Sequence, residues 1–207
     1  MLVPLRADGK SRLAEALDAG TRRALAEAML ADVVAATRSA GLTRIVLVAG
    51  GPPARAAGRR LGLEVVDDPA DGAGLDAALL HAGRRVGGDT LVLAADLPAL
   101  GRDDVTALIE APTPVVVAPT RGGGTAALLR RPDGCLAPAY GIGSAARHLA
   151  AATTAGLTAL VIERPGLAHD VDRPEDLVVP TGLVLGPATA AVLIELGRRR
   201  DGAGATG

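Results

Sequence analysis

The chain has 207 residues, which is enough for one domain with a single buried core. Its 22 Lys and Arg residues balance 23 Asp and Glu residues, and Tyr140 is the only aromatic residue, so the composition argues against a nucleic-acid or acidic-membrane binding surface. One cysteine, three scattered histidines and no signal-like or membrane-spanning segment exclude an internal disulfide, give no zinc-ligand spacing and predict a cytoplasmic protein.

Short apolar runs of strand length alternate along the chain with Ala- and Leu-rich stretches of helical spacing. We predict strands at 1–5, 44–49, 63–67, 90–95, 114–119 and 158–163. We predict helices at about 11–18, 21–40, 54–61, 74–86, 102–111 and 143–155. The strand runs are apolar throughout, which indicates a sheet covered on both faces. This order predicts an α/β fold with a mostly parallel sheet, in which ligands bind beyond the carboxyl ends of the strands.

The periodic pattern weakens from about Val179. We therefore place one domain at residues 1–178 and a C-terminal extension at residues 179–207. The end of this extension, "GRRRDGAGATG", is predicted to be a frayed or disordered tail.

The segment "PLRADGKSRL", residues 4–13, is the first candidate site. It predicts a strand, a short loop containing Gly9, and a helix whose first turn carries Lys10, Ser11 and Arg12. Backbone amides at a helix start, together with two cations, suit a polyphosphate. The second glycine of a Walker A loop is missing. The alternative is a solvated helix start with its cations in an unfavourable place for the helix dipole.

The second candidate site combines Asp96, at the end of "LVLAADLP", with Asp170 and Asp172 of "LAHDVDRPEDL". An Asp-x-Asp spacing in extended chain puts both carboxylates on one face, where they can share a divalent cation with a carboxylate from another strand end. In the alternative interpretation Asp96 is a turn residue, and Asp172 caps a helix that begins near Pro174.

Two glycine-rich segments are the remaining candidates. In "AYGIGSAARHL", residues 139–149, the glycines before Ser144 predict a second anion site, built from backbone amides, a hydroxyl and Arg147, or else an ordinary loop with Ser144 as helix cap. His148 lies inside the predicted helix and is interpreted as structural. In "TRGGGTAALLR", residues 120–130, Thr125 either offers its hydroxyl to a ligand or follows a simple turn.

No serine, cysteine or histidine is arranged in the sequence as an activated nucleophile. A reaction between two phosphates does not need one, because a substrate phosphate is already ionised at neutral pH. Attack on the α-phosphorus of a nucleotide then requires positioning and charge neutralisation more than a general base.

The segments "KSRL", "DDPADGAGLDAAL", "LAADLP", "GGGTAALL", "YGIGSAARHL" and "HDVDRPEDL" occur in an order that resembles the 2-phospho-L-lactate or phosphoenolpyruvate guanylyltransferases of coenzyme F420 biosynthesis, over about residues 2 to 178. The resemblance implies a three-layer nucleotidyltransferase fold, similar to that of nucleotide-diphospho-sugar transferases and of the molybdenum-cofactor guanylyltransferases. It also implies a GTP-dependent reaction that releases pyrophosphate.

The resemblance further implies roles for individual residues. Asp96, Asp170 and Asp172 would hold Mg²⁺, and Thr125, Gly141 and Ser144 would bind phosphoenolpyruvate or 2-phospho-L-lactate. The catalytic group would be Asp96 with Lys10 and Arg12, which face the triphosphate. The nucleotide site would be formed by these two cations with Arg6, Gly74 and Asp76.

The sequence departs from the family pattern around the two expected pockets. Arg6 stands where a lysine is usual, and Asp76 and Ala126 stand where the family usually has asparagine. Two alternatives therefore stay open. One is a related nucleotidyltransferase with another nucleotide or acceptor, and the other is a nucleotide-binding homologue without catalytic activity.

Overall fold

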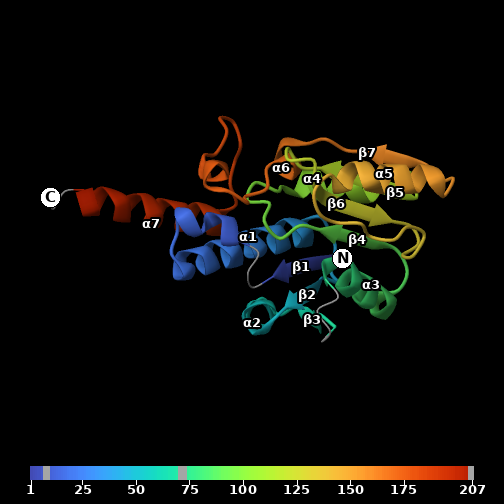
Figure 1. Ribbon diagram of the computed structural model, residues 1–207, viewed down its shortest axis with the longest axis horizontal. Coiled ribbons are helices and arrows are strands. Elements are labelled where there is room, and N and C mark those ends of the chain that lie inside the picture. The colour runs from blue at the N-terminus through green and yellow to red at the C-terminus, as the bar shows by residue number, and fades with distance from the viewer. Residues whose placement is uncertain (7–9, 70–73, 205–207) are drawn as a thin grey trace.

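The apolar runs form the strands of one sheet in the computed structural model, which describes residues 1–6, 10–69 and 74–204 (Figure 1). In chain order the strands are β1 Leu2–Arg6, β2 Val46–Gly50, β3 Glu64–Asp67, β4 Thr90–Leu93, β5 Val115–Pro119, β6 Thr125–Arg130 and β7 Ala159–Val161. Six of them fall on predicted strands, and β6 follows the glycine-rich loop, as expected. The strand order across the sheet is β3-β2-β1-β4-β6-β5-β7.

The sheet is parallel except at β6. Strand β1 pairs in parallel with β2 and β4, β2 pairs in parallel with β3, and β5 with β7, whereas β6 lies antiparallel to both β4 and β5. The prediction of a mostly parallel α/β sheet is confirmed. The reversal puts the beginning of β6, at Thr125, at the same edge as the ends of β1 and β4.

Helices cover both faces of the sheet because its strands are apolar on both faces. One core cluster joins α1 Ala19–Ser39, α2 Pro52–Arg60, α4 Arg102–Glu110 and α6 Pro165–Ala168 to one face. A second cluster joins α3 Gly74–Val86 and α5 Ser144–Thr154 to the opposite face. Neighbouring strand residues such as Leu2 and Val3 enter opposite clusters, as the strand period of two requires. The predicted three-layer arrangement is therefore observed.

The helices from α1 to α5 follow the sequence pattern except near the N-terminus, whereas α6 and α7 were not predicted. The helix expected at 11–18 is a short 3-10 helix, η1 Ser11–Glu15, and α1 begins at Ala19, where the Asp18 carboxylate accepts a hydrogen bond from the backbone N–H of Thr21. Our prediction of a regular helix after Lys10 was wrong, because Asp18 starts a new helix in the same stretch. A second 3-10 helix, η2 Pro174–Leu177, follows the Asp-x-Asp segment.

The C-terminal extension contains helix α7, Pro187–Gly204, which lies beside α1 (Figure 1). The buried carboxylate of Asp32, on α1, accepts hydrogen bonds from the backbone N–H groups of Ala188 and Thr189, at 3.0 and 2.8 Å. Gly186 lets the two segments approach, since a Cβ there would lie 2.2 Å from the Asp32 carboxyl carbon. Residues 197–204 of the predicted tail are described as the end of α7, and residues 205–207 lie outside the described residues.

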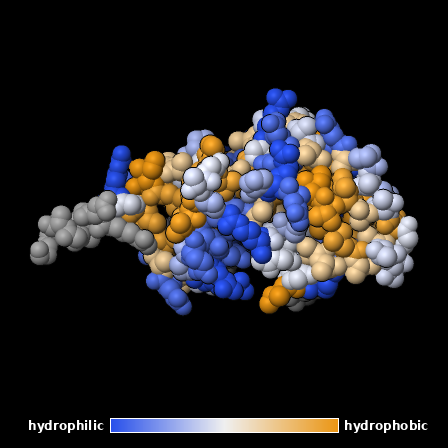
Figure 2. Space-filling model, turned by 90° about the horizontal axis from the view of Figure 1, so that it is seen from above, coloured by the Kyte–Doolittle hydropathy of each residue, from blue (hydrophilic) through white to orange (hydrophobic). Residues whose placement is uncertain are grey.

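A third apolar cluster fills the space between η1, α1 and α7. It contains Leu13, Leu17, Leu25, Met29 and Val171, with the α7 side chains Val192, Leu193 and Leu196 packed against it. The part of the surface near α7 is largely apolar in Figure 2, and the exposed large apolar residues of this region are Val178, Val184 and Ile194. No helix in the described part of the chain is long and apolar enough to cross a membrane.

Candidate functional site

The ends of β1 and β4, the start of β6 and the segment after α6 meet at one edge of the sheet. There the segment after β4, the start of β6 and the segment after α6 line a cavity of about 760 Å³, whose walls include Asp96, Thr125, Ser144, Asp170 and Asp172. The backbone N–H of Val171 donates to the carbonyl oxygen of Asp96 at 3.1 Å, which ties the Asp-x-Asp segment to the end of β4. The topology thus brings the second, third and fourth candidate segments of the sequence together.

Lys10 is the centre of what we call the carboxylate side, formed by Lys10, Asp96, Asp170 and Asp172. Its ammonium group lies 2.5 Å from Oδ2 of Asp96 and 3.0 Å from Oδ1 of Asp172, and also donates to the carbonyl oxygen of Val171. Burial by itself would lower the pKa of Lys10, but the two carboxylates together raise it, so the side chain is a firmly charged cation. Lys10 is the only lysine in the chain.

Asp170 is the carboxylate that this cation compensates least. Burial, followed by the negative charges of Asp96 and Asp172, raises the pKa of Asp170 to about 6. The ionised form of Asp170 is therefore unfavourable without additional positive charge nearby. All three carboxylates line the large cavity.

The donor set of the carboxylate side is chemically suited to Mg²⁺, because carboxylate and carbonyl oxygens are the ligands that hard divalent cations prefer. In the structure the Lys10 ammonium group takes the place of such a cation between Asp96, Asp172 and the Val171 carbonyl oxygen. Within the described ranges, no three acidic, His or Cys side chains are arranged closely enough to hold a metal ion as they stand. The residues fit the ion in chemistry, while Lys10 provides the positive charge in this arrangement.

Thr125 and Ser144 also line the large cavity, and with the buried His148 behind them they form what we call the hydroxyl side. Thr125 Oγ1 lies 2.9 Å from Ser144 Oγ and 3.0 Å from Nδ1 of His148, and all three side chains are buried. Ser144 opens α5, and its backbone N–H donates to the carbonyl oxygen of Gly141 at 3.0 Å. This side is neutral, because burial lowers the pKa of His148 to about 4.

The loop before α5 is held by side chains rather than by regular structure. Gly141 has a φ of +112° and Gly143 a φ of +69°, conformations that favour glycine. The Arg147 guanidinium donates to the carbonyl oxygens of Ala139, Tyr140 and Ile142. Arg147, expected to contact an anion, thus has these donors engaged in fixing the loop.

Asp76, at the start of α3, accepts a hydrogen bond from the backbone N–H of Tyr140 at 2.9 Å. An asparagine side-chain oxygen would accept the same bond, so the departure from the family pattern at this position preserves the contact. Ala126, the other departure, is buried in the core on β6.

A basic cavity of about 250 Å³ lies on the other side of Lys10. It is lined by Arg6, Lys10, Arg22 and Arg23, with Ala54 of α2 among its apolar residues. Arg6 ends β1 and forms an ion pair of 2.7 Å with Asp68. A smaller cavity of about 180 Å³ shares Arg6 and Lys10 with the basic cavity, and shares Asp96, Thr125 and Tyr140 with the large one.

Of the remaining predicted nucleotide residues, Arg12 lines the large cavity and Gly74 lies at the start of α3. Arg12 is 59% exposed on η1, with Nη1 3.8 Å from Oδ2 of Asp172. Gly74 begins α3 with a φ of +86°. Gly9 and the segment 70–73 of "DDPADGAG" lie outside the described residues. Because η1 is a five-residue 3-10 helix, the predicted anion site at a regular helix start is not present at Lys10.

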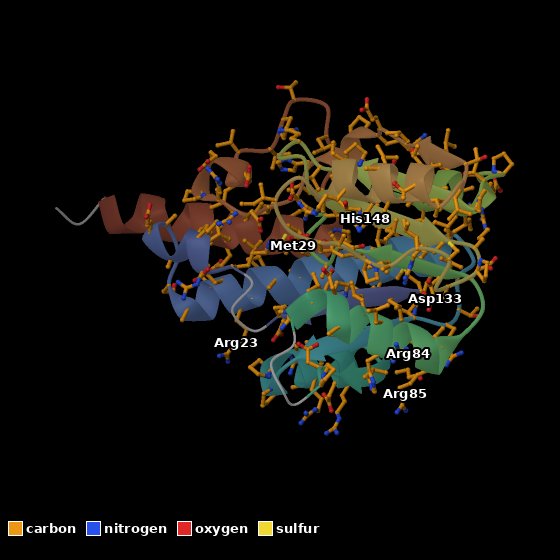
Figure 3. All side chains as sticks on the ribbon, turned by 45° about the vertical axis from the view of Figure 1, so that its right-hand side comes forward. Arg23, Met29, Arg84, Arg85, Asp133 and His148 are labelled. Atoms are coloured by element: carbon orange, nitrogen blue, oxygen red, sulfur yellow. The ribbon has the colours of Figure 1, made fainter. Side chains whose placement is uncertain are left out.

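Sequence reasoning did not single out Arg22 and Arg23, and it interpreted His148 as structural. His148 follows Ser144 by four residues, so both lie on one face of α5, and this spacing is a signal that the histidine can lie beside Ser144. Arg22 and Arg23 lie in the first turns of α1, which pack near the end of β1 only in the folded chain. Figure 3 shows His148 toward the middle of the molecule, whereas Arg23 lies at its periphery.

Comparison with known families shows which family the chain belongs to. Residues 1–183 match the family described as "Guanylyl transferase CofC like". The chain belongs to this family. The resemblance found in the order of the sequence motifs is therefore confirmed, and the protein is a nucleotidyltransferase of the CofC-like family.

Curated guanylyltransferases are similar in sequence to this CofC-like chain over most of its length. The phosphoenolpyruvate guanylyltransferase of Conexibacter woesei is 40% identical over 178 residues, which are 81% of this chain and 79% of the relative. The phosphoenolpyruvate guanylyltransferase of Nocardia farcinica is 42% identical over 199 residues, 91% of this chain and 86% of the relative. A 3-phospho-D-glycerate guanylyltransferase of Phenylobacterium zucineum is 35% identical over 201 residues, 92% of each chain.

The solved structures support the fold. A protein of Desulfovibrio desulfuricans G20 described as a nucleotide-diphospho-sugar transferase superposes with a TM-score of 0.70 at 15% identity, covering 95% of this chain and 94% of the other. At this identity the likeness concerns the fold alone. It confirms the nucleotide-diphospho-sugar transferase-like fold predicted from the sequence.

Proposed function

We propose that this protein transfers GMP from GTP to phosphoenolpyruvate with release of pyrophosphate, as a step of coenzyme F420 biosynthesis. One observation carries the proposal: the carboxylate side, with Lys10 and Asp96, lies between a basic cavity and a cavity lined by hydroxyls. We assign the basic cavity to the phosphates of the nucleotide. We assign the hydroxyl side, with Gly141, to the acceptor.

The chemistry needs two bound phosphates and no activated side chain. An ionised oxygen of the acceptor phosphate attacks the α-phosphorus of GTP, a new P–O bond forms, and the bond from the α-phosphorus to the bridging oxygen breaks. Pyrophosphate leaves with the electron pair of that bond. The cations Arg6, Lys10 and Arg12 stabilise its charge, and Thr125 and Ser144 orient the acceptor.

We further propose that Asp96, Asp170 and Asp172 hold Mg²⁺, because all three carboxylates line the large cavity and hard divalent cations prefer oxygen ligands. When bound, the ion would supply charge neutralisation for the phosphates. Its positive charge would also relieve the repulsion that raises the pKa of Asp170. Lys10, which compensates two of these carboxylates in the structure, would then have its charge available to the pyrophosphate.

The acceptor is proposed from the relatives' names. The phosphoenolpyruvate guanylyltransferases among the relatives share 36–42% identity with this chain, and the 3-phospho-D-glycerate enzyme shares 35%. 2-Phospho-L-lactate carries the same phosphate and carboxylate and is the second candidate acceptor. Asp76 preserves the contact of an asparagine, which supports the usual architecture around Tyr140.

Pyrophosphate release by the purified protein with GTP and Mg²⁺ tests this function. Parallel reactions contain phosphoenolpyruvate, 2-phospho-L-lactate, 3-phospho-D-glycerate or no acceptor, with GTP replaced by CTP or UTP in a second series, and mass spectrometry identifies the product. We expect release that depends on phosphoenolpyruvate. Release only with CTP or UTP would exclude guanylyl transfer, and nucleotide binding without release for any acceptor would identify a non-catalytic homologue.

A further inference from the structure

His148 is a buried histidine for which the proposed reaction has no role. Its side chain is fully buried on α5, with the Tyr140 ring edge-on at a centroid distance of 5.1 Å. Nε2 of His148 lies 2.8 Å from the backbone nitrogen of Ala139, and Nδ1 lies 3.0 Å from Thr125 Oγ1. Both ring nitrogens therefore have partners.

The partner of Nε2 determines the tautomer of His148. A backbone N–H can only donate, so Nε2 must accept the hydrogen bond from Ala139 and carries no proton. The single proton of a neutral imidazole is then on Nδ1. Consequently Nδ1–H donates to Thr125 Oγ1, and the doubly protonated ring is disfavoured because it would place two N–H groups against each other.

The direction of this bond determines what the two hydroxyls can offer a ligand. Thr125 and Ser144 together have two hydroxyl hydrogens, and one of them forms the bond between Thr125 Oγ1 and Ser144 Oγ. With the opposite tautomer, the second hydrogen would be donated to Nδ1 of His148, leaving the pair with acceptor lone pairs only. Because Nδ1 carries its own proton, the second hydroxyl hydrogen stays available.

We propose that His148 is a positioning residue that keeps one hydroxyl hydrogen of the Thr125 and Ser144 pair free to donate to an anionic group of the acceptor substrate. Both hydroxyl residues line the large cavity, and hydroxyl donors bind phosphate or carboxylate oxygens, whereas bare lone pairs repel them. The inference rests on the proposed function for the identity of the acceptor. The bond directions themselves do not depend on it.

The surroundings of His148 favour the neutral ring that this arrangement needs. Burial lowers the pKa of His148, the charge of Asp76 opposes this shift, and the nearby Arg147 and Arg130 add to it. The Ala139 carbonyl oxygen, next to the amide that bonds Nε2, is held by Arg147. Ala139 is thus held through both its N–H and its carbonyl oxygen, which fixes the N–H that selects the tautomer of His148.

The first test compares steady-state kinetics of His148→Leu and His148→Asn. Leucine removes the N–H that occupies a lone pair of Thr125 Oγ1, so the free hydroxyl hydrogen is no longer directed toward the cavity. We therefore expect the KM for phosphoenolpyruvate to rise about tenfold, the loss expected for a hydrogen bond to a charged group, with the KM for GTP unchanged. Asparagine can place an N–H near the former Nδ1 and should restore most of this KM. His81→Asn, at an exposed position on α3, is the matched control. Equal KM values for both His148 variants and the wild type would overturn the proposal.

A double-mutant cycle separates positioning from general structural damage. In a Thr125→Val background the hydroxyl that His148 orients is already gone, so His148→Leu should raise the acceptor KM by less than about twofold further. A purely structural role for His148 predicts that the two effects multiply. That second result would overturn the proposal.

The tautomer is measured without any assumption about activity. Long-range ¹H–¹⁵N correlation spectra near neutral pH distinguish protonated from unprotonated ring nitrogens, and the spectrum of His148→Asn identifies the His148 signals. We expect a proton on Nδ1 and none on Nε2. The Nε2–H tautomer or a doubly protonated ring would refute the bond directions. A protein with the expected tautomer but no transferase activity would instead show that the proposed function fails.

Discussion

The two sides of the candidate site differ in charge and in exposure to solvent. The carboxylate side is charged and partly open, since the side chains of Asp96 and Asp172 are 24% and 39% exposed. The hydroxyl side is neutral and buried, and each polar atom there has a protein partner. A charged side can exchange partners when a ligand arrives, whereas a neutral side whose polar atoms are already held by protein partners keeps its free hydroxyl hydrogen in place in advance.

The largest expected effect is a loss of kcat when one residue of the carboxylate side is changed. Asp170→Asn should lower kcat by at least about 100-fold, because it removes a charge proposed to bind Mg²⁺. The thermal midpoint should stay the same or rise, since the raised pKa of Asp170 means that its ionised form is unfavourable in the folded protein at neutral pH. Kinetics and calorimetry measure both quantities. Asp103→Asn, exposed on α4, is the control, and full activity of Asp170→Asn would contradict the assignment.

The next effect tests the cation that compensates this side. Lys10→Met leaves Asp96 and Asp172 without their ion pair, and we expect the free energy of unfolding in urea to fall by about 1–2 kcal/mol, less than for a fully buried pair because both carboxylates contact solvent. Lys10→Arg keeps the charge and should recover most of the stability but less of the activity, because a guanidinium has a different shape. Unchanged stability in Lys10→Met would show that the ion pairs contribute little.

Asp32 lies away from both sides of the site, and we expect its substitution to affect only the packing behind the carboxylate side. Asp32→Ala removes the carboxylate that caps α7, and we expect a loss of about 1 kcal/mol in the free energy of unfolding. The apolar cluster shared by α7, η1 and Val171 backs the Lys10 segment, so kcat should fall a few-fold. The acceptor KM should be unchanged. A raised acceptor KM would instead mean that the two sides are coupled.

The smallest effect concerns the hydroxyl side and appears in the pH dependence of stability. Burial lowers the pKa of His148 from 6.5 to about 4, so the unfolded chain binds a proton between these values that the folded chain does not. Stability should therefore fall as the pH falls through this range, by about 1 kcal/mol between about pH 7 and about pH 5.5. His148→Leu should lack this part of the slope. Urea unfolding of both proteins at each pH measures the difference, and parallel slopes would contradict it.

Much of the fold could be predicted because it depends on local patterns. The six predicted strands and the boundaries of α3, at Gly74 and Val86, follow from apolar runs and helical spacing. The region after Lys10 could not be predicted, because the cap at Asp18 competes with an earlier helix start. The same holds for α7, whose position depends on Asp32, a residue more than 150 positions earlier in the chain.

For the site, the sequence by itself determined which residue types are available: carboxylates at strand ends, a lysine after β1, and a hydroxyl opening α5. Their order was enough to indicate the family. The tertiary structure alone decided their partners, since the sheet order puts Lys10 between Asp96 and Asp172 and puts His148 against Thr125. The physical reason is that charge compensation and proton position depend on distances of about 3 Å between residues far apart in the chain, and only the folded sheet sets those distances.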